Sequence, residues 1–438
     1  MLTREENELL TRTGPGTPMG NVMRRYWVPA LLSWEVPQAD CPPVRLKLLG
    51  ESLIGFRDTS GRVGLLDEFC AHRKASLFLG RNEEHGLRCV FHGWKYDVEG
   101  QCVDMPCEPP DSRLAMKIRL KAYATLELGG IIWAYMGPQE KLPPPPKFDW
   151  TQVPDTHRQV TKTWEECNWL QALEGGLDTA HVSYLHFGGL YNAASALSPD
   201  HAAAMWARSR SPDLEVDVTD YGYHYAGIRP LEAMGTWVRG YHYVMPWTQI
   251  RPAQLQGSRG QVEESSEWKP LIAGHYWVPM DDENCIVWNW HYTFGPEALS
   301  DDERRDESAG PENVYEDRGF RKKRNRDNDW LIDRDAQKTR SFTGIRGINT
   351  QDHAIQESMG PIVDRTTEHL GTVDKAIIAT RRLLLQAVKT VEAGGDPPGV
   401  APAYYTVRAI EKVIRPGADW RAELLPNMHP EPDLTVAR

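Results

Sequence analysis

Two short pairs of cysteine and histidine constrain the fold of this chain more than any other feature. Cys70 and His72 form the first pair, Cys89 and His92 form the second, and sixteen residues separate the pairs. Thiolate and imidazole groups are ligands for zinc and iron, and their repeated order makes four unrelated core residues a poor explanation. The pairs therefore predict a metal site that joins two loops. A zinc ion accepts a Cys2His2 set, and a [2Fe–2S] cluster accepts two cysteines on one iron and two histidines on the other.

Short apolar runs separated by glycine, aspartate and serine surround both pairs. This pattern predicts a small antiparallel β domain with the pairs on loops at the hairpin tips. Pro143–Pro146 end the pattern, because neither a helix nor a central strand continues through four prolines. The expected organisation is an N-terminal segment at 1–40 that packs on the later domain, a β domain at 41–140, a linker at 141–150 and a second domain at 151–438.

The second domain combines strands with a long helix. Apolar or aromatic residues alternate with polar ones, as in half-buried strands, in 213–230, 235–247 and 284–296. Later, apolar residues from Val373 to Val391 mark one face of a helix that Thr372 can cap and Gly394 can end. The charged stretch 295–330 predicts a solvent-exposed excursion. An antiparallel sheet with one long C-terminal helix makes the fold class α+β.

Composition argues against several classes of protein. The net charge of -11 disfavours a nucleic-acid surface and a polybasic membrane anchor. No stretch approaches the roughly 18 apolar residues of a membrane helix, and the polar start lacks the apolar core of a signal peptide. We therefore expect a cytoplasmic protein, in which an odd number of cysteines, seven, favours metal ligation over disulfides.

A second metal motif follows the linker. Asp178, His181 and His186 have the spacing D-x2-H-x4-H. Two histidines and a carboxylate form the facial triad of non-haem iron oxygenases, which leaves open positions on the metal. His181 follows Asp178 by three residues, which predicts that both side chains project from one side of a helical turn. Alone, the motif is better explained by surface or core histidines, but behind a cluster-binding pattern it predicts an iron that receives electrons.

Together the two motifs resemble those of Rieske non-haem iron oxygenases, the aromatic-ring-hydroxylating family. The resemblance rests on the patterns C-x-H-R, L-x-x-G and C-x-x-H-G-W-x-Y between Cys70 and Tyr96, and on the later D-x2-H-x4-H motif. It extends over nearly the whole chain, and segments 11–30 and 356–370 are similar to the phthalate dioxygenase branch. Two further cysteines close downstream, Cys102 and Cys107, keep zinc as the alternative to the cluster.

The resemblance implies two cofactors. A Rieske [2Fe–2S] cluster would be bound by Cys70, His72, Cys89 and His92. A mononuclear Fe²⁺ would be bound by His181, His186 and Asp352. Asp352 is the first candidate for a distant carboxylate ligand, and Asp364 and Asp374 are the next. Asp178 would link the iron site by hydrogen bonds to a cluster histidine of a neighbouring subunit, so that electrons cross it.

The resemblance also implies the fold of each domain and the partners. An all-β Rieske domain would precede a helix-grip catalytic domain of the Bet v1 or START kind, and the subunits would form trimers or stacked trimers. A separate NAD(P)H-dependent flavin and iron–sulfur reductase would supply electrons. The chain itself has no glycine fingerprint for a dinucleotide and no plant-type ferredoxin cysteines.

The implied function is that of a terminal oxygenase that uses O2 to cis-dihydroxylate an aromatic carboxylate such as phthalate or isophthalate. Relatives of this branch hold aromatic carboxylates with pocket arginines, for which Arg208 and Arg239 are the candidates, because a guanidinium matches a carboxylate bidentately. A solvated arginine or a structural ion pair explains either residue equally well. Two alternatives stay open: a monooxygenase or O-demethylase acting on a substituted benzoate, and a non-catalytic zinc or electron-carrier protein.

Overall fold

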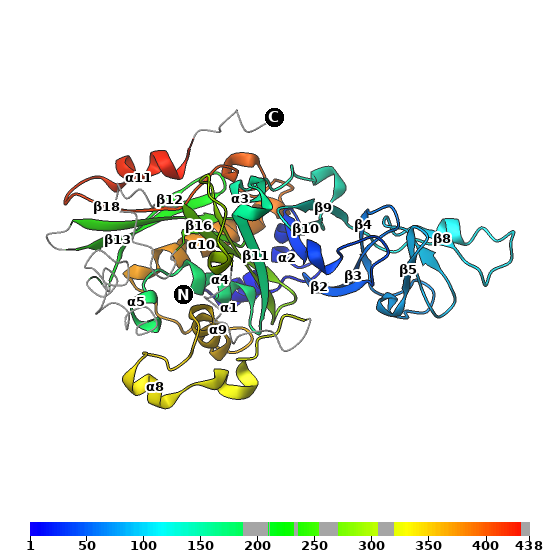
Figure 1. Ribbon diagram of the computed structural model, residues 1–438, viewed down its shortest axis with the longest axis horizontal. Coiled ribbons are helices and arrows are strands. Elements are labelled where there is room, and N and C mark those ends of the chain that lie inside the picture. The colour runs from blue at the N-terminus through cyan, green and yellow to red at the C-terminus, as the bar shows by residue number, and fades with distance from the viewer. Residues whose placement is uncertain (187–208, 210, 232–234, 254–269, 305–318, 431–438) are drawn as a thin grey trace. The chain divides into compact units, whose positions relative to one another are not determined.

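The computed structural model divides the chain into two compact units (Figure 1). The β unit comprises Arg12–Pro146 with Val278–Asp282, and the α+β unit comprises Met1–Thr11, Lys147–Trp277 and Glu283–Arg438. The residues that the structure describes are 1–186, 209, 211–231, 235–253, 270–304 and 319–430. Within these residues, no helix is both long and apolar enough to cross a membrane.

Three small antiparallel sheets build the β unit, as the apolar runs predicted. Their strand orders are β1-β10-β9, β2-β3-β4 and β5-β6-β7-β8. The strands are β1 Trp27–Leu32, β2 Val44–Leu48, β3 Glu51–Arg57, β4 Val63–Asp67, β5 Arg81–Glu83, β6 Gly86–Arg88, β7 Lys95–Tyr96, β8 Cys102–Asp104, β9 Ala124–Leu128 and β10 Ile131–Tyr135. Because β1 pairs with β10, most of the expected N-terminal segment 1–40 belongs to the β unit, and only residues 1–11 belong to the α+β unit.

One eight-stranded antiparallel sheet forms the centre of the α+β unit. Its order is β11-β17-β16-β15-β14-β13-β12, and β18 also pairs with β14. The strands are β11 Arg158–Glu165, β12 Asp213–Val218, β13 Gly222–Pro230, β14 Thr236–Val244, β15 Thr248–Pro252, β16 Leu271–Pro279, β17 Cys285–Thr293 and β18 Ile410–Ile414. All three stretches predicted as strands in this part of the chain are strands.

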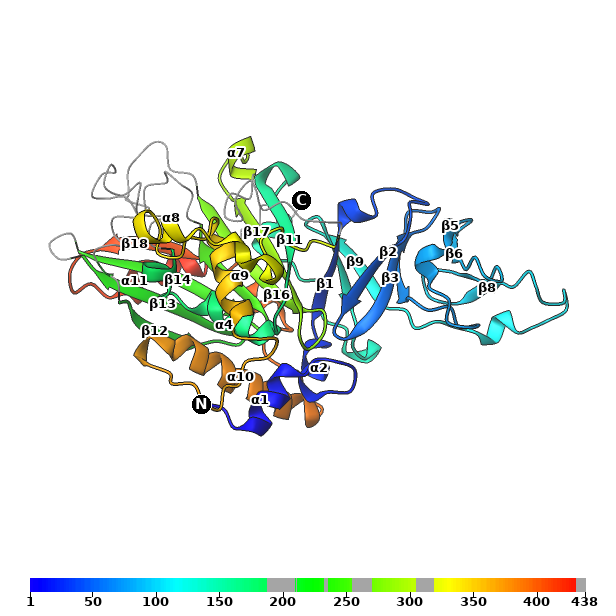
Figure 2. The same cartoon turned by 90° about the horizontal axis from the view of Figure 1, so that it is seen from below.

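Helices cover both faces of this sheet. The longer helices are α4 Trp169–Leu177, α9 Ile348–Ser358, α10 Lys375–Glu392 and α11 Trp420–Met428. Tyr223 of β13 donates a hydrogen bond from its hydroxyl to the carbonyl of Ala376, which places α10 on the face of that side chain. Ala226 and Val238 instead pack against α11. Because successive side chains of a strand point to opposite faces, α11 covers the face away from α10, and Figure 2 shows α4, α9 and α10 on the other side.

The long C-terminal helix is present but begins later than predicted. Helix α10 starts at Lys375, and Thr372 lies in a preceding 3-10 turn instead of capping the helix. Gly394 follows the C-terminus of α10 with a left-handed φ of 83°, as expected of a helix-ending glycine. The short helices are α1 Arg4–Thr11, α2 Pro18–Met23, α3 Asp149–Gln152, α5 Val182–Leu185, α7 Asp301–Arg304 and α8 Arg334–Thr339.

Candidate active site

The four predicted cluster ligands lie on two loops with the same backbone geometry. In each loop, the N–H of the cysteine donates to the carbonyl five residues later, and the cysteine carbonyl accepts from the N–H four residues later. The fourth residue after each cysteine, Lys74 in one loop and Gly93 in the other, has a left-handed φ, of 60° and 75°. The two Cys–His pairs are therefore held by a repeated turn structure.

The side chains of these loops converge in a way that suits a metal cluster. Cys70 and Cys89 are 1% and 2% exposed, and the rings of His72 and His92 meet edge to face with centroids 4.5 Å apart. The Tyr96 hydroxyl lies 3.3 Å from Cys70 Sγ. His92 Nδ1 is buried and has no hydrogen-bond partner among the described residues. A buried imidazole nitrogen in that state fits a metal ligand.

The spacing of the four side chains argues against a single zinc ion. A tetrahedral zinc site holds its sulfur and nitrogen ligands roughly 3.3–3.8 Å from one another. Among the described residues, one group of three or more potential ligands has all its ligand atoms within 4.8 Å, and that group is His181, His186 and Asp352. No three of the cluster candidates therefore have all their ligand atoms within 4.8 Å of one another, which a tetrahedral zinc site needs and a site for two bridged irons does not.

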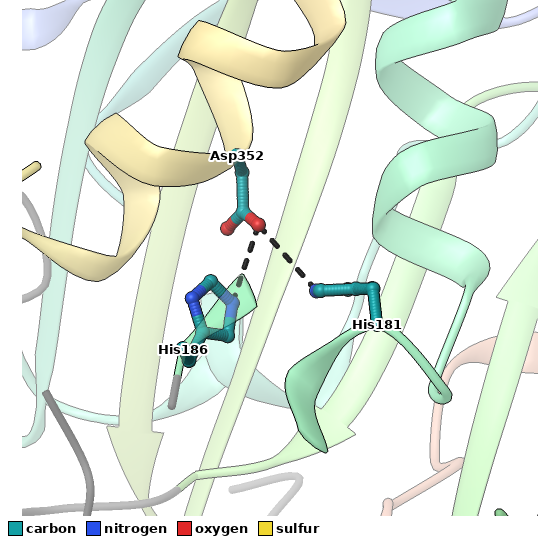
Figure 3. A group of neighbouring side chains, drawn as sticks. All are labelled: His181, His186 and Asp352. Atoms are coloured by element: carbon teal, nitrogen blue, oxygen red, sulfur yellow. Dashed lines mark ion pairs between the residues drawn. The ribbon is translucent and has the colours of Figure 1, made fainter. Parts of the chain in front are cut away.

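The predicted iron triad is brought together in the α+β unit (Figure 3). His181 precedes α5, His186 follows it, and Asp352 lies on α9. Asp352 Oδ1 is 3.4 Å from His181 Nε2 and 3.2 Å from His186 Nε2. Two imidazole nitrogens and one carboxylate oxygen facing a common point are the donor set of a facial-triad iron site.

The electrostatics of the triad favour a cation between its members. Burial raises the pKa of Asp352, but His186 and His181 outweigh it and hold that pKa far below the usual range. Burial lowers the pKa of His181, but Asp178 and Asp352 raise it to about 10. The carboxylates thus create a site that attracts positive charge, which a divalent metal ion supplies when it replaces protons.

Asp178 contacts His181, although the predicted helical turn is wrong. Helix α4 ends at Leu177, Asp178 is its C-cap, and His181 is the residue before α5. Asp178 Oδ2 nevertheless lies 3.4 Å from His181 Nδ1, and Asp178 Oδ1 accepts the N–H of Ala180 at 2.6 Å. The non-helical link between α4 and α5 therefore makes the contact that a single helix was expected to make.

Two glycines allow α4 to approach its neighbours. A Cβ atom at Gly175 would stand 2.1 Å from Nε2 of Gln356 on α9, and one at Gly176 would stand 2.1 Å from Cζ2 of Trp277 on β16. Both distances are far below van der Waals contact. Gly175 thus lets the end of α4, with Asp178, reach the helix that carries Asp352, and Gly176 lets it reach the sheet.

The two fallback carboxylates have local roles. Asp364 Oδ1 accepts the N–H of Thr366 at 3.0 Å, and Asp374 Oδ2 accepts the N–H of Gly371 at 2.6 Å. Both side chains stabilise turns, which short acidic side chains commonly do. Asp352 is the carboxylate that the structure places beside the two histidines.

A cavity of about 140 Å³ opens beside the triad. Part of its lining comes from strands β14 to β17, where the residues that face the cavity are alternate residues of each strand and therefore lie on one face of the sheet. These residues are Arg239, Tyr241, Gln249, Arg251, His275, Trp277, Val287 and Asn289. In the pairing of β15 with β16, Gln249 lies directly opposite His275. Arg251 is two residues further along β15, opposite Ala273. Ile348 and Asn349 of α9 are among the lining residues that come from outside the sheet.

Three cavity residues that the sequence reasoning missed form a hydrogen-bonded chain. Arg251 Nε donates to His275 Nε2 at 3.0 Å, and His275 Nδ1 lies 2.7 Å from Asn289 Oδ1. Burial and the Arg251 charge lower the pKa of His275 to about 3. The imidazole is therefore neutral at neutral pH, with Nδ1 donating to Asn289 and Nε2 accepting from Arg251.

Of the two predicted substrate arginines, Arg239 is within the described residues and forms an ion pair with Glu411. Arg208 lies outside the described residues. Arg239 lines the cavity but is 4% exposed. Its Nε lies 2.8 Å from Glu411 Oε2, and its Nη2 donates to the Pro252 carbonyl at 2.9 Å. Glu411 of β18 is the residue directly opposite Arg239 in the sheet register, so the pair is a buried cross-strand ion pair.

Comparison with known protein families covers almost the whole chain. Residues 26–124 match the Rieske [2Fe-2S] domain. Residues 134–433 match the family described as LigXa C-terminal domain like. Rieske oxygenase subunits of this kind carry a [2Fe–2S] cluster and a mononuclear iron, and the two donor sets above fit these groups. The second match is to a catalytic domain, which removes the alternative of a non-catalytic zinc or electron-carrier protein.

Similar proteins agree with this assignment. The chain is 39% identical to the 3-chlorobenzoate-3,4-dioxygenase oxygenase subunit of Comamonas testosteroni, over 96% of this chain and 97% of that protein. It is 37% identical to the phthalate 4,5-dioxygenase oxygenase subunit of Pseudomonas putida, over 96% and 94%. The solved structure of NdmA from Pseudomonas putida CBB5 shares the fold with a TM-score of 0.59 at 19% identity, over 87% and 96% of the chains. The chain is an oxygenase (alpha) subunit of the Rieske non-haem iron oxygenases and belongs to their phthalate-dioxygenase-like branch.

Proposed function

We propose that this chain is the terminal oxygenase of a multicomponent dioxygenase that cis-dihydroxylates an aromatic carboxylate, such as phthalate or isophthalate. The observation that carries the proposal is a single cavity lined both by the triad of His181, His186 and Asp352 and by the guanidinium of Arg251. A carboxylate held by Arg251 would leave the aromatic ring beside the triad. The two relatives described above are named for benzoate and phthalate substrates, which supports the same class.

Charge at the strand end of the cavity favours an anionic substrate. Burial raises the pKa of Glu411 above its ordinary value, and the nearby charges of Arg239 and Arg251 oppose that rise. Two guanidinium groups thus lie at this end of the cavity lining, and Arg251 is the one that also contacts His275. His275 accepts one of the five N–H donors of Arg251 and, being neutral, does not offset the charge. A substrate carboxylate in this cavity would accept charge-assisted hydrogen bonds from the guanidinium of Arg251.

The remaining walls suit one aromatic ring. Trp277, Tyr241, Val287 and Ile348 supply flat or apolar surface to the lining. A volume of about 140 Å³ is close to that of a protein cavity that accommodates benzene, about 150 Å³. A single ring with small polar substituents therefore matches the space better than a fused ring system does.

The chemistry needs both metal groups, and the chain offers a donor set for each. The cluster would be held by Cys70, His72, Cys89 and His92. The mononuclear iron would be held by His181, His186 and Asp352. When bound, the cluster stores electrons and the iron activates dioxygen. In the net reaction, an arene, O2, two electrons and two protons give a cis-dihydrodiol, with a separate NAD(P)H-dependent reductase as the electron source.

Asp178 would act beside the iron site. Its carboxylate accepts a hydrogen bond from His181 Nδ1, which leaves Nε2 of that ring as the metal ligand. We further propose that Asp178 carries electrons from a cluster histidine of a neighbouring subunit, in a trimer or stacked trimers. The exposed side of the Asp178 carboxyl, which is 25% exposed, is compatible with such a contact.

A single turnover with labelled oxygen tests the proposal. Metal-replete protein would be reduced chemically, separated from the reductant, and mixed with ¹⁸O2 and a panel of phthalate isomers, chlorobenzoates and methoxybenzoates. A ring diol with two labelled oxygens is the expected product. One labelled oxygen, with or without formaldehyde, would instead identify a monooxygenase or O-demethylase. Oxidation of the cluster without any product from the panel would contradict the carboxylate assignment.

A further inference from the structure

Gln351 connects a candidate iron ligand to the protein backbone. The residue precedes Asp352 on α9 and is 3% exposed. Its Oε1 lies 2.7 Å from His186 Nδ1, and its Nε2 donates to the Ile345 carbonyl at 2.8 Å. Both ends of the side-chain amide are therefore engaged, one by a fixed backbone group and the other by the imidazole.

The backbone contact determines which way the amide faces and thus which nitrogen of His186 carries the proton. A carbonyl oxygen only accepts hydrogen bonds, so the amide nitrogen of Gln351 must face Ile345. Its amide oxygen then faces His186 and can only accept, so Nδ1 of His186 must donate. The proton on Nδ1 leaves a lone pair on Nε2, the nitrogen that lies 3.2 Å from Asp352 Oδ1.

We propose that Gln351 is a positioning residue for the iron site, which holds the His186 ring in place and selects the tautomer whose Nε2 faces the metal. The inference rests on the proposed iron site. It also makes the two histidines unequal. His181 donates to the Asp178 carboxylate, whereas His186 donates to a neutral amide. An anionic acceptor makes an imidazole a stronger donor to a metal than a neutral acceptor does.

Metal affinity of the full chain, with its [2Fe–2S] cluster intact, provides the test. The mononuclear metal would be removed by chelation and the protein titrated with Co²⁺ against a fluorescent divalent-ion indicator. Gln351→Met keeps the length of the side chain but cannot accept from Nδ1, and we expect Co²⁺ to bind about 10- to 100-fold more weakly. Gln351→Glu presents an acceptor to His186 in either protonation state, so its affinity should equal or exceed that of the wild type.

Gln171 of α4 offers a matched control. Its amide is also buried and donates to the carbonyls of Gln356 and Gly360 at 2.9 and 2.8 Å. Gln171→Met removes these hydrogen bonds without touching either histidine. It should lower thermal stability and leave the Co²⁺ affinity unchanged, which separates loss of a buried amide from loss of the contact to His186.

A further variant distinguishes failure of this inference from failure of the proposed iron site. His186→Ala should abolish tight Co²⁺ binding; wild-type affinity in that variant would overturn the ligand assignment itself. If His186→Ala loses the metal while Gln351→Met retains it, only the role of Gln351 is overturned. Equal weakening in the Met and Glu variants, or in Gln351→Met and Gln171→Met, would also overturn that role.

Discussion

Replacing Gly176 with alanine tests how tightly α4 must pack to bring the iron site together. The added Cβ would stand 2.1 Å and 2.2 Å from Cζ2 and Cη2 of Trp277, whereas carbon atoms in contact prefer about 3.5–4.0 Å. The indole is 4% exposed and part of a packed strand. The ring or the helix must therefore move by more than an ångström.

The neighbouring Gly175→Ala variant supplies the reference for the magnitude. Both glycines lie within α4, so both variants gain about 1 kcal/mol of helix propensity. At Gly175 the new Cβ meets the end of the flexible Gln356 side chain, with Nε2 at 2.1 Å, which can rotate away. At Gly176 it meets a rigid ring, and overpacking of this kind costs about 1–3 kcal/mol. We expect Gly176→Ala to be less stable than Gly175→Ala by about 1–2 kcal/mol.

Urea unfolding of both variants, followed by tryptophan fluorescence and far-UV circular dichroism, measures this difference. The comparison between variants cancels the helix-propensity term and any effect on the unfolded chain that the two share. If the close approach were unimportant, Gly176→Ala would have the same stability as Gly175→Ala. Equal stability of the two variants, or higher stability of Gly176→Ala, would refute the claim that Trp277 restrains α4.

Three further predictions concern electron transfer, substrate binding and pH. Asp178→Asn should keep wild-type iron and acid-labile sulfide contents but turn over about 10- to 100-fold more slowly; near-normal turnover would remove Asp178 from the electron path. Arg251→Gln should raise KM for a carboxylated substrate about tenfold or more, through loss of one charge-assisted hydrogen bond, and an unchanged KM would contradict the anchor. Burial raises the pKa of Glu165 to about 8, so the folded chain keeps a proton that the unfolded chain releases above pH 4.5. The stability from this group is therefore present at low pH and lost as pH rises toward 8. Between pH 5 and 7, the free energy of unfolding of Glu165→Gln should rise relative to that of the wild type by up to about 1.4 kcal/mol per pH unit. A constant difference between the urea midpoints of the two proteins over this pH range would refute this.

Local spacing in the sequence predicted which candidate metal ligands the structure brings together better than it predicted what surrounds them. The Cys–His pairs follow from spacing alone, because both ligands of each pair lie within one turn. Asp352 is separated from His186 by more than 160 residues, so only the family resemblance pointed to it. The interior of the charged stretch was predicted to be solvated, yet Lys322 is 1% exposed and pairs with Glu357 at 2.5 Å. Charge alternation does not reveal a buried partner on another element.

The substrate end of the cavity shows why tertiary structure was needed. The alternation of apolar and polar residues along a strand predicts which side chains share a face. It does not predict which of the two faces packs against α9. Arg251, His275 and Asn289 come from three strands, and their contact depends on the register between those strands. For Arg239, alternation predicted an inward side chain, but the carboxylate opposite it, Glu411, lies on a strand far along the chain.

The late position of Glu411 has a consequence for biosynthesis. When Arg239 and Arg251 emerge from the ribosome, Glu411 on β18 has not yet been made, and neither has Asp352. The two turns that carry Cys70, His72, Cys89 and His92 are complete long before. All four candidate cluster ligands are thus present in a growing chain while the candidate iron site still lacks Asp352 and Arg239 still lacks its cross-strand partner. The order of residues along the chain thus completes the candidate cluster site before the candidate iron site.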